Sequence, residues 1–205
     1  MDGKTRHVVV VCGYGCHLFD ADGDPTPLIL YLNRVVEFVS IVETVDHIFL
    51  CGGRTQQKSA PGVSESGLMY RYLIHELALD TISFRGRDKD LFILEERSYT
   101  TFYNIAYAAE QIRSKIWNIN PDEKVKITIF CEAQRSPNVI QLARHFMIDL
   151  VETIDDISVE TASWERADPF KQVRNLIYNR LAIKYPWLGL AEREQRKRIQ
   201  RSYHI

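Results

Sequence analysis

Four polar residues that could contact a ligand recur three positions apart in and after one apolar run, Leu91–Glu96. They are Glu95, Ser98, Thr101 and Asn104. Residues three apart share one face of a helix, and a face that packs on a core seldom carries Thr and Asn. A carboxylate, two hydroxyls and an amide can hydrogen-bond a ribose or an amino group, so we interpret the row as ligand contacts. The alternatives are a helix cap at Ser98 and a polar network without a ligand.

Glycine pairs follow two other apolar runs. Gly13 and Gly15 come after the β-branched run that ends at Cys12, and Gly52 and Gly53 come directly after Ile48–Cys51. Glycines at the carboxyl ends of strands allow a ligand to approach the backbone closely. Both turns are therefore candidate binding loops.

Ser64 and Glu65 begin a segment with helical spacing after the second glycine pair. The N-terminus of such a helix offers unpaired N–H groups to an anion, which makes both residues candidate ligand contacts. The local alternative is that Ser64 is the N-cap and Glu65 is an acidic first-turn residue that the helix dipole stabilises.

Arg135 lies at the end of another apolar run, Lys126–Cys131, just before Ser136 and Pro137. Serine followed by proline is a strong helix-start signal. An arginine at this position suits a phosphate or carboxylate group, and the alternative is a surface ion pair with Glu132.

Three of the four cysteines close apolar runs, and the fourth stands in a loop; they are Cys12, Cys51, Cys131 and Cys16. If the runs are neighbouring parallel strands, three thiols lie along one edge of the sheet. We favour the interpretation that they are small apolar side chains in crowded strand ends. A soft-metal site or a reactive thiolate is the alternative, but the chain has no CxxC pair, so no metal site is predicted.

The elements that must position these residues alternate strand with helix. We predict an α/β protein: a Rossmann-like, mostly parallel sheet of about five strands with helices on both faces and a C-terminal helical appendage. The predicted ligand-binding domain is 1–165, and 166–205 is a helical extension that packs on it or trails from it. Strands are expected to start near Val8, Ile48, Leu91 and Lys126, with a fifth in 156–164; helices are expected at 27–44 and 64–79 and after Asp168, and a short strand at 81–84.

Composition limits the function classes. The 205 residues carry a formal net charge of −1, which argues against nucleic acid or an acidic membrane surface as a partner. Neither a signal-peptide core nor a run long enough to span a bilayer is present, so we expect a cytoplasmic protein. The basic run at 193–201 is typical of a solvated helix face, with contact to nucleic acid or to a partner as the alternative.

Four ordered motifs, VVVVCGYG, IFLCGGRTQQKSAPGVSESGLM, LEERSYTTFYN and IFCEAQRSPNVIQLAR, together resemble the bacterial YdcF/SanA/ElyC-like family. The resemblance covers roughly 8–146. It implies a Rossmann-like fold and S-adenosylmethionine as a proposed ligand. The positions that match are Gly13, Gly15, Gly52, Gly53, Ser64, Glu65, Glu95, Ser98, Thr101 and Asn104; the chain departs from the family pattern at Tyr103, Cys131, Glu132, Arg135 and Asn138.

The leading expectation is the binding of a nucleotide-like small molecule, S-adenosylmethionine by resemblance, at the carboxyl edge of the sheet, with transferase activity as a further step. The alternatives are a phosphoester-type hydrolase and a non-catalytic interaction protein. Ser98 is the most plausible hydroxyl nucleophile near an acid for the hydrolase, but no histidine is placed by the sequence to activate it.

Overall fold

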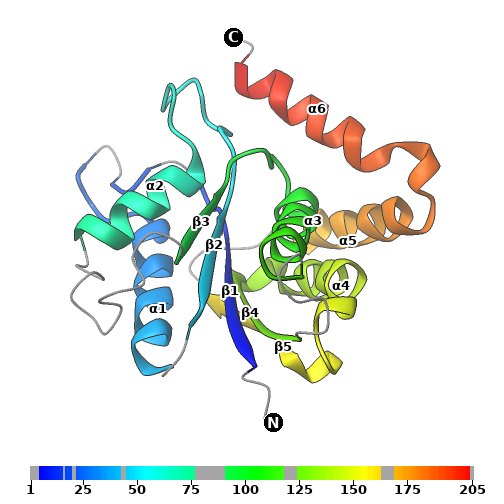
Figure 1. Ribbon diagram of the computed structural model, residues 1–205. Helices are drawn as coiled ribbons and strands as arrows, with labels where there is room; N and C mark the ends of the chain where they lie inside the picture. Colours follow the sequence, from blue (N-terminus) through cyan, green and yellow to red (C-terminus); the bar gives the residue numbers. More distant parts are fainter. Residues whose placement is uncertain are drawn as a thin grey trace.

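The computed structural model describes residues 5–15, 17–19, 22–42, 45–76, 91–117, 124–162 and 169–203. At its centre is an all-parallel sheet of five strands in the order β3-β2-β1-β4-β5 (Figure 1). The strands are β1 (Arg6–Cys12), β2 (His47–Cys51), β3 (Phe92–Glu95), β4 (Val125–Glu132) and β5 (Ile157–Ala162). The predicted α/β, Rossmann-like fold class is confirmed.

The central strand β1 is apolar at consecutive positions because both of its faces are covered. Val8 and Val10 pack in one core cluster, and Val9 and Val11 pack in a second cluster on the opposite face. All four valines are fully buried. A continuous β-branched run is what a parallel strand with two covered faces requires.

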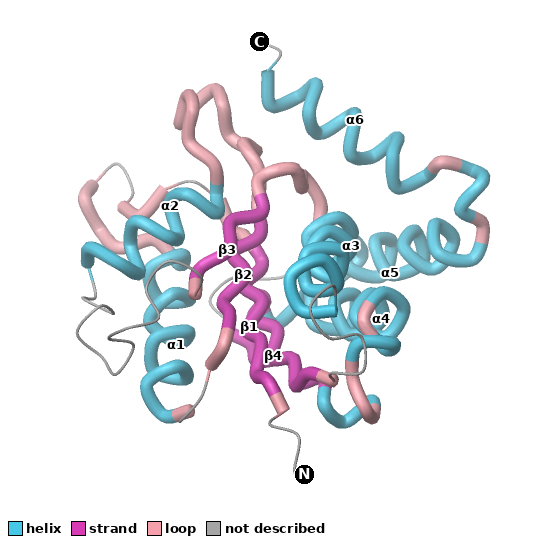
Figure 2. The backbone as a smooth tube through the Cα atoms, in the orientation of Figure 1, coloured by secondary structure: helices cyan, strands magenta, loops and turns pink. Residues whose placement is uncertain are grey.

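Helices cover the two faces in pairs (Figure 2). Helices α1 (Pro27–Ile41) and α2 (Glu65–Arg71) belong to one core, and α3 (Thr101–Ile112) and α4 (Ser136–Phe146) belong to the other. Within the described ranges, π-helical turns extend α2 and α3, and 3₁₀ turns lie elsewhere. Their bounds are Tyr72–Glu76, Arg113–Trp117, Ala133–Arg135, Ile148–Leu150, Ile154–Asp156 and Pro186–Leu188.

The C-terminal part consists of α5 (Pro169–Lys184) and α6 (Leu190–Tyr203). Helix α5 packs against α4, and α6 contacts both α5 and α3. A break follows α5: Pro186 begins a 3₁₀ turn that Gly189 caps with φ +59, and α6 leaves in a new direction. Figure 1 shows α6 crossing beyond the carboxyl ends of the strands.

Several predicted boundaries differ from the structure. Helix α1 ends at Ile41 rather than Thr44. Ser98 is not a helix cap, because Thr100 accepts the Tyr103 amide at 3.2 Å and α3 begins one residue later. The predicted strand at 81–84, the distal end of the helix expected to 79, Asp168 and Cys16 lie outside the described residues. Among the described residues, no helix is long and apolar enough to cross a membrane.

Candidate functional site at the carboxyl edge of the sheet

The direction of the strand order reverses between β1 and β4. From β1 the chain adds β2 and β3 on one side, and β4 and β5 on the other. In open α/β sheets, ligands bind beyond the carboxyl ends of the strands at such a switch point, where the loops diverge. The Gly13–Gly15 turn after β1 and Arg135 after β4 flank the crevice.

A cavity of about 380 Å³ lies at this point. It contains six of the predicted site residues, Gly13, Gly15, Glu65, Thr101, Asn104 and Arg135, and also residues that the sequence did not single out: Tyr14, Thr55, Gln56, Tyr99, Thr100 and Arg198. We call this cavity the switch-point cleft. Its volume is within the range of small-molecule sites in proteins.

Glu65 is the buried acid of the switch-point cleft. Its side chain accepts a hydrogen bond from the Thr55 hydroxyl, and the residue is only 7% exposed. Burial raises the pKa of the Glu65 carboxyl, while the hydrogen bond from Thr55 and the guanidinium groups of Arg135 and Arg198 act in the opposite direction. A partly compensated carboxyl at a cavity wall can accept hydrogen bonds from hydroxyl or amino groups of a ligand.

Glu65 also explains why Gly13 and Gly52 are glycines. A Cβ atom on Gly13 would overlap the Glu65 carboxylate and would lie 2.7 Å from the Cys51 carbonyl oxygen. A Cβ on Gly52 would lie 2.7 Å from the Glu65 Cβ. Both glycines therefore make room for a protein carboxylate. Gly15 instead has φ +88, a left-handed conformation that favours glycine, and lines the cleft beside Gln56.

Arg135 joins the two sides of the crevice. Its guanidinium pairs with Glu132 at 3.3 Å, donates to the Gly13 carbonyl at 3.3 Å and lies over the Tyr14 ring at 5.0 Å from the centroid. The ion pair with Glu132, which the sequence left as the alternative, is present. Arg135 nevertheless lines the cleft, so one guanidinium serves both the protein contact and the cavity wall.

Three other predicted residues, Gly52, Gly53 and Ser64, lie beside the cleft without lining it. Ser64 is the N-cap of α2, accepting the Gly67 amide at 3.0 Å, and its hydroxyl also donates to Glu96. Gly53 donates its amide to the Ser98 carbonyl at 2.7 Å, and a Cβ there would lie 2.6 Å from the same oxygen. Like Gly52, these residues hold the loops together.

Glu95 lies beneath the loop that leads from β3 to α3, and Ser98 is a buried residue of that loop. Glu95 is 1% exposed, Ser98 is fully buried, and neither is among the residues that line the switch-point cleft. Glu95 Oε1 accepts the Arg97 amide at 2.7 Å and lies 3.9 Å from the Arg97 guanidinium. Burial raises the pKa of the Glu95 carboxyl, while the Ser98 hydroxyl beside the carboxyl acts with Arg97 to lower it. Of the four residues in the predicted polar row, only Thr101 and Asn104 line the switch-point cleft.

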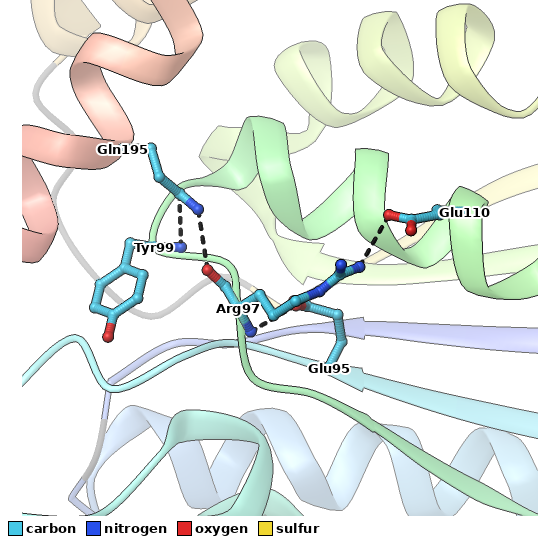
Figure 3. A network of polar contacts seen from close by, with 5 residues as sticks. All are labelled: Glu95, Arg97, Tyr99, Glu110 and Gln195. Atoms are coloured by element: carbon cyan, nitrogen blue, oxygen red, sulfur yellow. Dashed lines mark hydrogen bonds and ion pairs between the residues drawn. The ribbon is translucent and has the colours of Figure 1, made fainter.

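Helix α6 contributes residues that sequence reasoning missed. Gln195 accepts from the Tyr99 amide and donates to the Arg97 carbonyl, both at 3.0 Å (Figure 3). Arg198 donates to the Tyr99 carbonyl at 3.4 Å, and Ser202 donates to the Arg54 carbonyl. The signal available in the sequence was the spacing of Gln195, Arg198 and Ser202, which places three polar groups on one face of an otherwise charged helix.

A second cavity of about 560 Å³ adjoins the first. The two share Tyr14, Thr100, Thr101, Arg135 and Arg198. The second extends between α3, α4, α5 and α6, and we call it the interhelical cavity. Its wall includes Asn138, one of the positions where the chain departs from the family pattern.

The three thiols at the strand ends lie in one buried core under α3 and α4. Cys12 and Cys51 are register partners on adjacent strands, and Cys12, Cys51 and Cys131 are all free and buried. Burial raises the pKa of Cys12 to about 12 and raises the pKa of the other two thiols as well. Within the described residues, no group of three or more His, Cys, Asp or Glu side chains could hold a metal ion. The packing interpretation fits these thiols.

Comparison of the chain with models of protein families, with curated proteins and with solved structures gives no match, so the site rests on its own geometry.

Proposed function

We propose that this chain binds a nucleotide-like small molecule in the switch-point cleft, and that the molecule is S-adenosylmethionine, the ligand implied by the resemblance to the YdcF/SanA/ElyC-like family. The observation that carries the proposal is the buried Glu65 carboxylate, which faces a cavity of about 380 Å³ beside the Gly13–Gly15 turn. A buried carboxylate at a topological switch point suits a ribose or an amino group.

The other cleft residues suit the remaining groups of such a ligand. Thr101 and Asn104 offer neutral hydrogen bonds, and Tyr14 offers an aromatic face. Arg135 and Arg198 are cations that can pair with the carboxylate of an amino-acid moiety. In this arrangement Glu65 takes the role that the sequence pattern suggested for Glu95.

Titration calorimetry with S-adenosylmethionine, an adenine dinucleotide and ATP tests this proposal. We expect saturable binding of S-adenosylmethionine, weakened roughly tenfold to a hundredfold by Glu65→Gln, because a hydrogen bond to a charged group contributes about 1.5–3 kcal/mol. Glu152→Gln, the same change at an exposed carboxylate, is the matched control and should bind like the wild type. Absence of heat with all three ligands, or equal affinity of the Glu65→Gln variant, would reject the site.

Catalysis in the same cleft is a second candidate function. The burial that raises the pKa of Glu65 brings a carboxyl closer to the range in which it can exchange protons with a substrate. Ser98 is poorly placed as a nucleophile because it is fully buried and is not among the residues that line the switch-point cleft. A methyl transfer or phosphoester hydrolysis that survives Ser98→Ala but is lost in Glu65→Gln would support this alternative.

A further inference from the structure

The interhelical cavity carries an excess of positive charge. Five cationic residues line it, one from the start of α4 and four from α5 and α6: Arg135, Lys171, Arg174, Arg198 and Arg201. Two carboxylates, Glu132 and Glu194, line it as well. In a chain whose formal net charge is −1, five cations around one cavity form a local concentration of positive charge.

The two carboxylates are already paired within the wall. Glu132 pairs with Arg135 at 3.3 Å, and Glu194 pairs with Arg198 at 3.2 Å. Among the residues that the structure describes, neither Arg174 nor Arg201 forms an ion pair or a hydrogen bond through its side chain. No described carboxylate therefore forms an ion pair with either of these two guanidinium groups.

The N-terminal turns of three helices add to the positive electrostatic potential in the interhelical cavity. The cavity wall includes Thr101 and Phe102 in the first turn of α3, Asn138 in the first turn of α4, and Lys171 in the first turn of α5. The N-terminal turn of a helix carries unpaired N–H groups and the positive end of the helix dipole. Although Thr100 accepts one N–H of α3 and a 3₁₀ turn precedes α4, the positive dipole ends of these helices favour an anion together with the two arginines that form no ion pair with a described residue.

We propose that the interhelical cavity binds a phosphorylated small molecule, whose phosphate is held by Arg174 and Arg201. Arginine presents a planar array of donors that matches phosphate oxygens in pairs, and two guanidinium groups can share one phosphate. A small molecule fits better than nucleic acid because the charges line a cavity between four helices. This inference does not depend on which ligand occupies the switch-point cleft.

The shared residues give the two sites a functional relation. Tyr14, Thr100 and Thr101 stand between the switch-point cleft and the interhelical cavity and line both. A phosphorylated molecule in the second site would therefore lie next to the ligand in the first, as two substrates of a group transfer do.

Calorimetry with inorganic diphosphate as the probe tests the inference. We expect one saturable site on the wild-type chain, with an affinity that falls as NaCl increases, because salt screens charge pairs near the surface. The double variant Arg174→Gln/Arg201→Gln should bind diphosphate at least tenfold more weakly. Both side chains are exposed, so the variant should keep the thermal unfolding midpoint of the wild type.

A matched control separates a built site from general surface charge. Arg180 and Arg193 lie on the same two helices, are exposed and do not line the cavity. Arg180→Gln/Arg193→Gln should leave diphosphate binding unchanged. Equal weakening by both double variants, or no saturable binding to the wild type, would overturn the proposal. Binding of a single-stranded oligonucleotide that is lost in the Arg174→Gln/Arg201→Gln variant while diphosphate does not bind would overturn it in favour of nucleic acid.

Discussion

Two glutamates near strand ends have different surroundings. Glu95 is the last residue of β3 and is the register partner of Cys51. Its side chain is therefore directed to the same side of the sheet as the Cys51 side chain, under the loop before α3. Glu65 is in the first turn of α2 and points across the two glycine turns into the switch-point cleft. One carboxylate is therefore enclosed by the protein, and the other lies in the wall of the switch-point cleft.

The pH dependence of stability should report the buried state of Glu95. Burial raises its pKa in the folded chain, so the folded state keeps a proton that the unfolded state has already released. The contribution of the Glu95 carboxyl to the free energy of unfolding is highest below the pKa that it has in the unfolded chain. This contribution falls as pH rises through the pKa that it has in the folded chain. In Glu95→Gln, urea titrations should therefore show a smaller loss of stability than in the wild type as pH rises above the unfolded glutamate pKa of about 4.3.

Glu152→Gln serves as the control for this measurement because Glu152 is exposed. It should retain the wild-type loss of stability. If Glu95→Gln behaved in the same way, the raised pKa assigned to Glu95 would be wrong.

At the scale of elements, α6 is the part that completes the site. It contacts the loop after β2 through Ser202 and the loop after β3 through Gln195 and Arg198. The basic run that the sequence suggested as a solvated face therefore supplies a cavity wall on one side, and residues such as Arg193 and Arg196 stay exposed on the other. Removing α6 should affect the cavities as well as any partner.

Gln195 should be the main attachment of α6 to the loop before α3. In Gln195→Ala the Tyr99 amide and the Arg97 carbonyl lose their partner in a part-buried position, where an intramolecular hydrogen bond contributes about 0.5–1.5 kcal/mol. We expect a loss of stability of that order in urea unfolding and faster hydrogen exchange at the Tyr99 amide. Gln200→Ala, on an exposed position of the same helix, should change neither. Unchanged protection of Tyr99 in Gln195→Ala would mean that α6 does not hold this loop.

At the scale of the whole molecule, one continuous sheet supports both cavities. The core that contains the three strand-end thiols lies directly under α3 and α4, whose first turns form part of the cavity walls. Asn104 connects the apolar core to the cavity wall, because it hydrogen-bonds the buried Cys12 thiol and also lines the cleft. The polar edge is thus built on a packed apolar base.

The thiols should react only when the sheet opens. In a Cys16→Ser background, a thiol reagent should modify Cys12, Cys51 and Cys131 at the rate of unfolding, because all three are buried and their raised pKa values keep them protonated. In urea all three should react at once. Rapid modification under native conditions would instead support the reactive-thiolate interpretation.

Local patterns in the chain determined most of the fold. The runs that begin near Val8, Ile48, Leu91 and Lys126 form strands because β-branched and apolar residues follow one another without interruption, and each is followed by turn residues. The start of α1 at Pro27 and the cap of α2 at Ser64 follow from chemistry within three or four residues. Such signals depend on neighbours in the chain, so they can be interpreted without tertiary contacts.

The tertiary structure alone decided which polar residues meet at the site. Glu95 and Asn104 share a sequence row, but the loop before α3 folds back onto Gly53 and buries Glu95 while Asn104 faces the cleft. Gln195 meets Tyr99 across 96 positions of chain, and no local spacing records that contact. The sequence by itself determined that a polar edge would form at the ends of the strands; long-range packing determined which side chains line it, because burial depends on what the rest of the chain places above each residue.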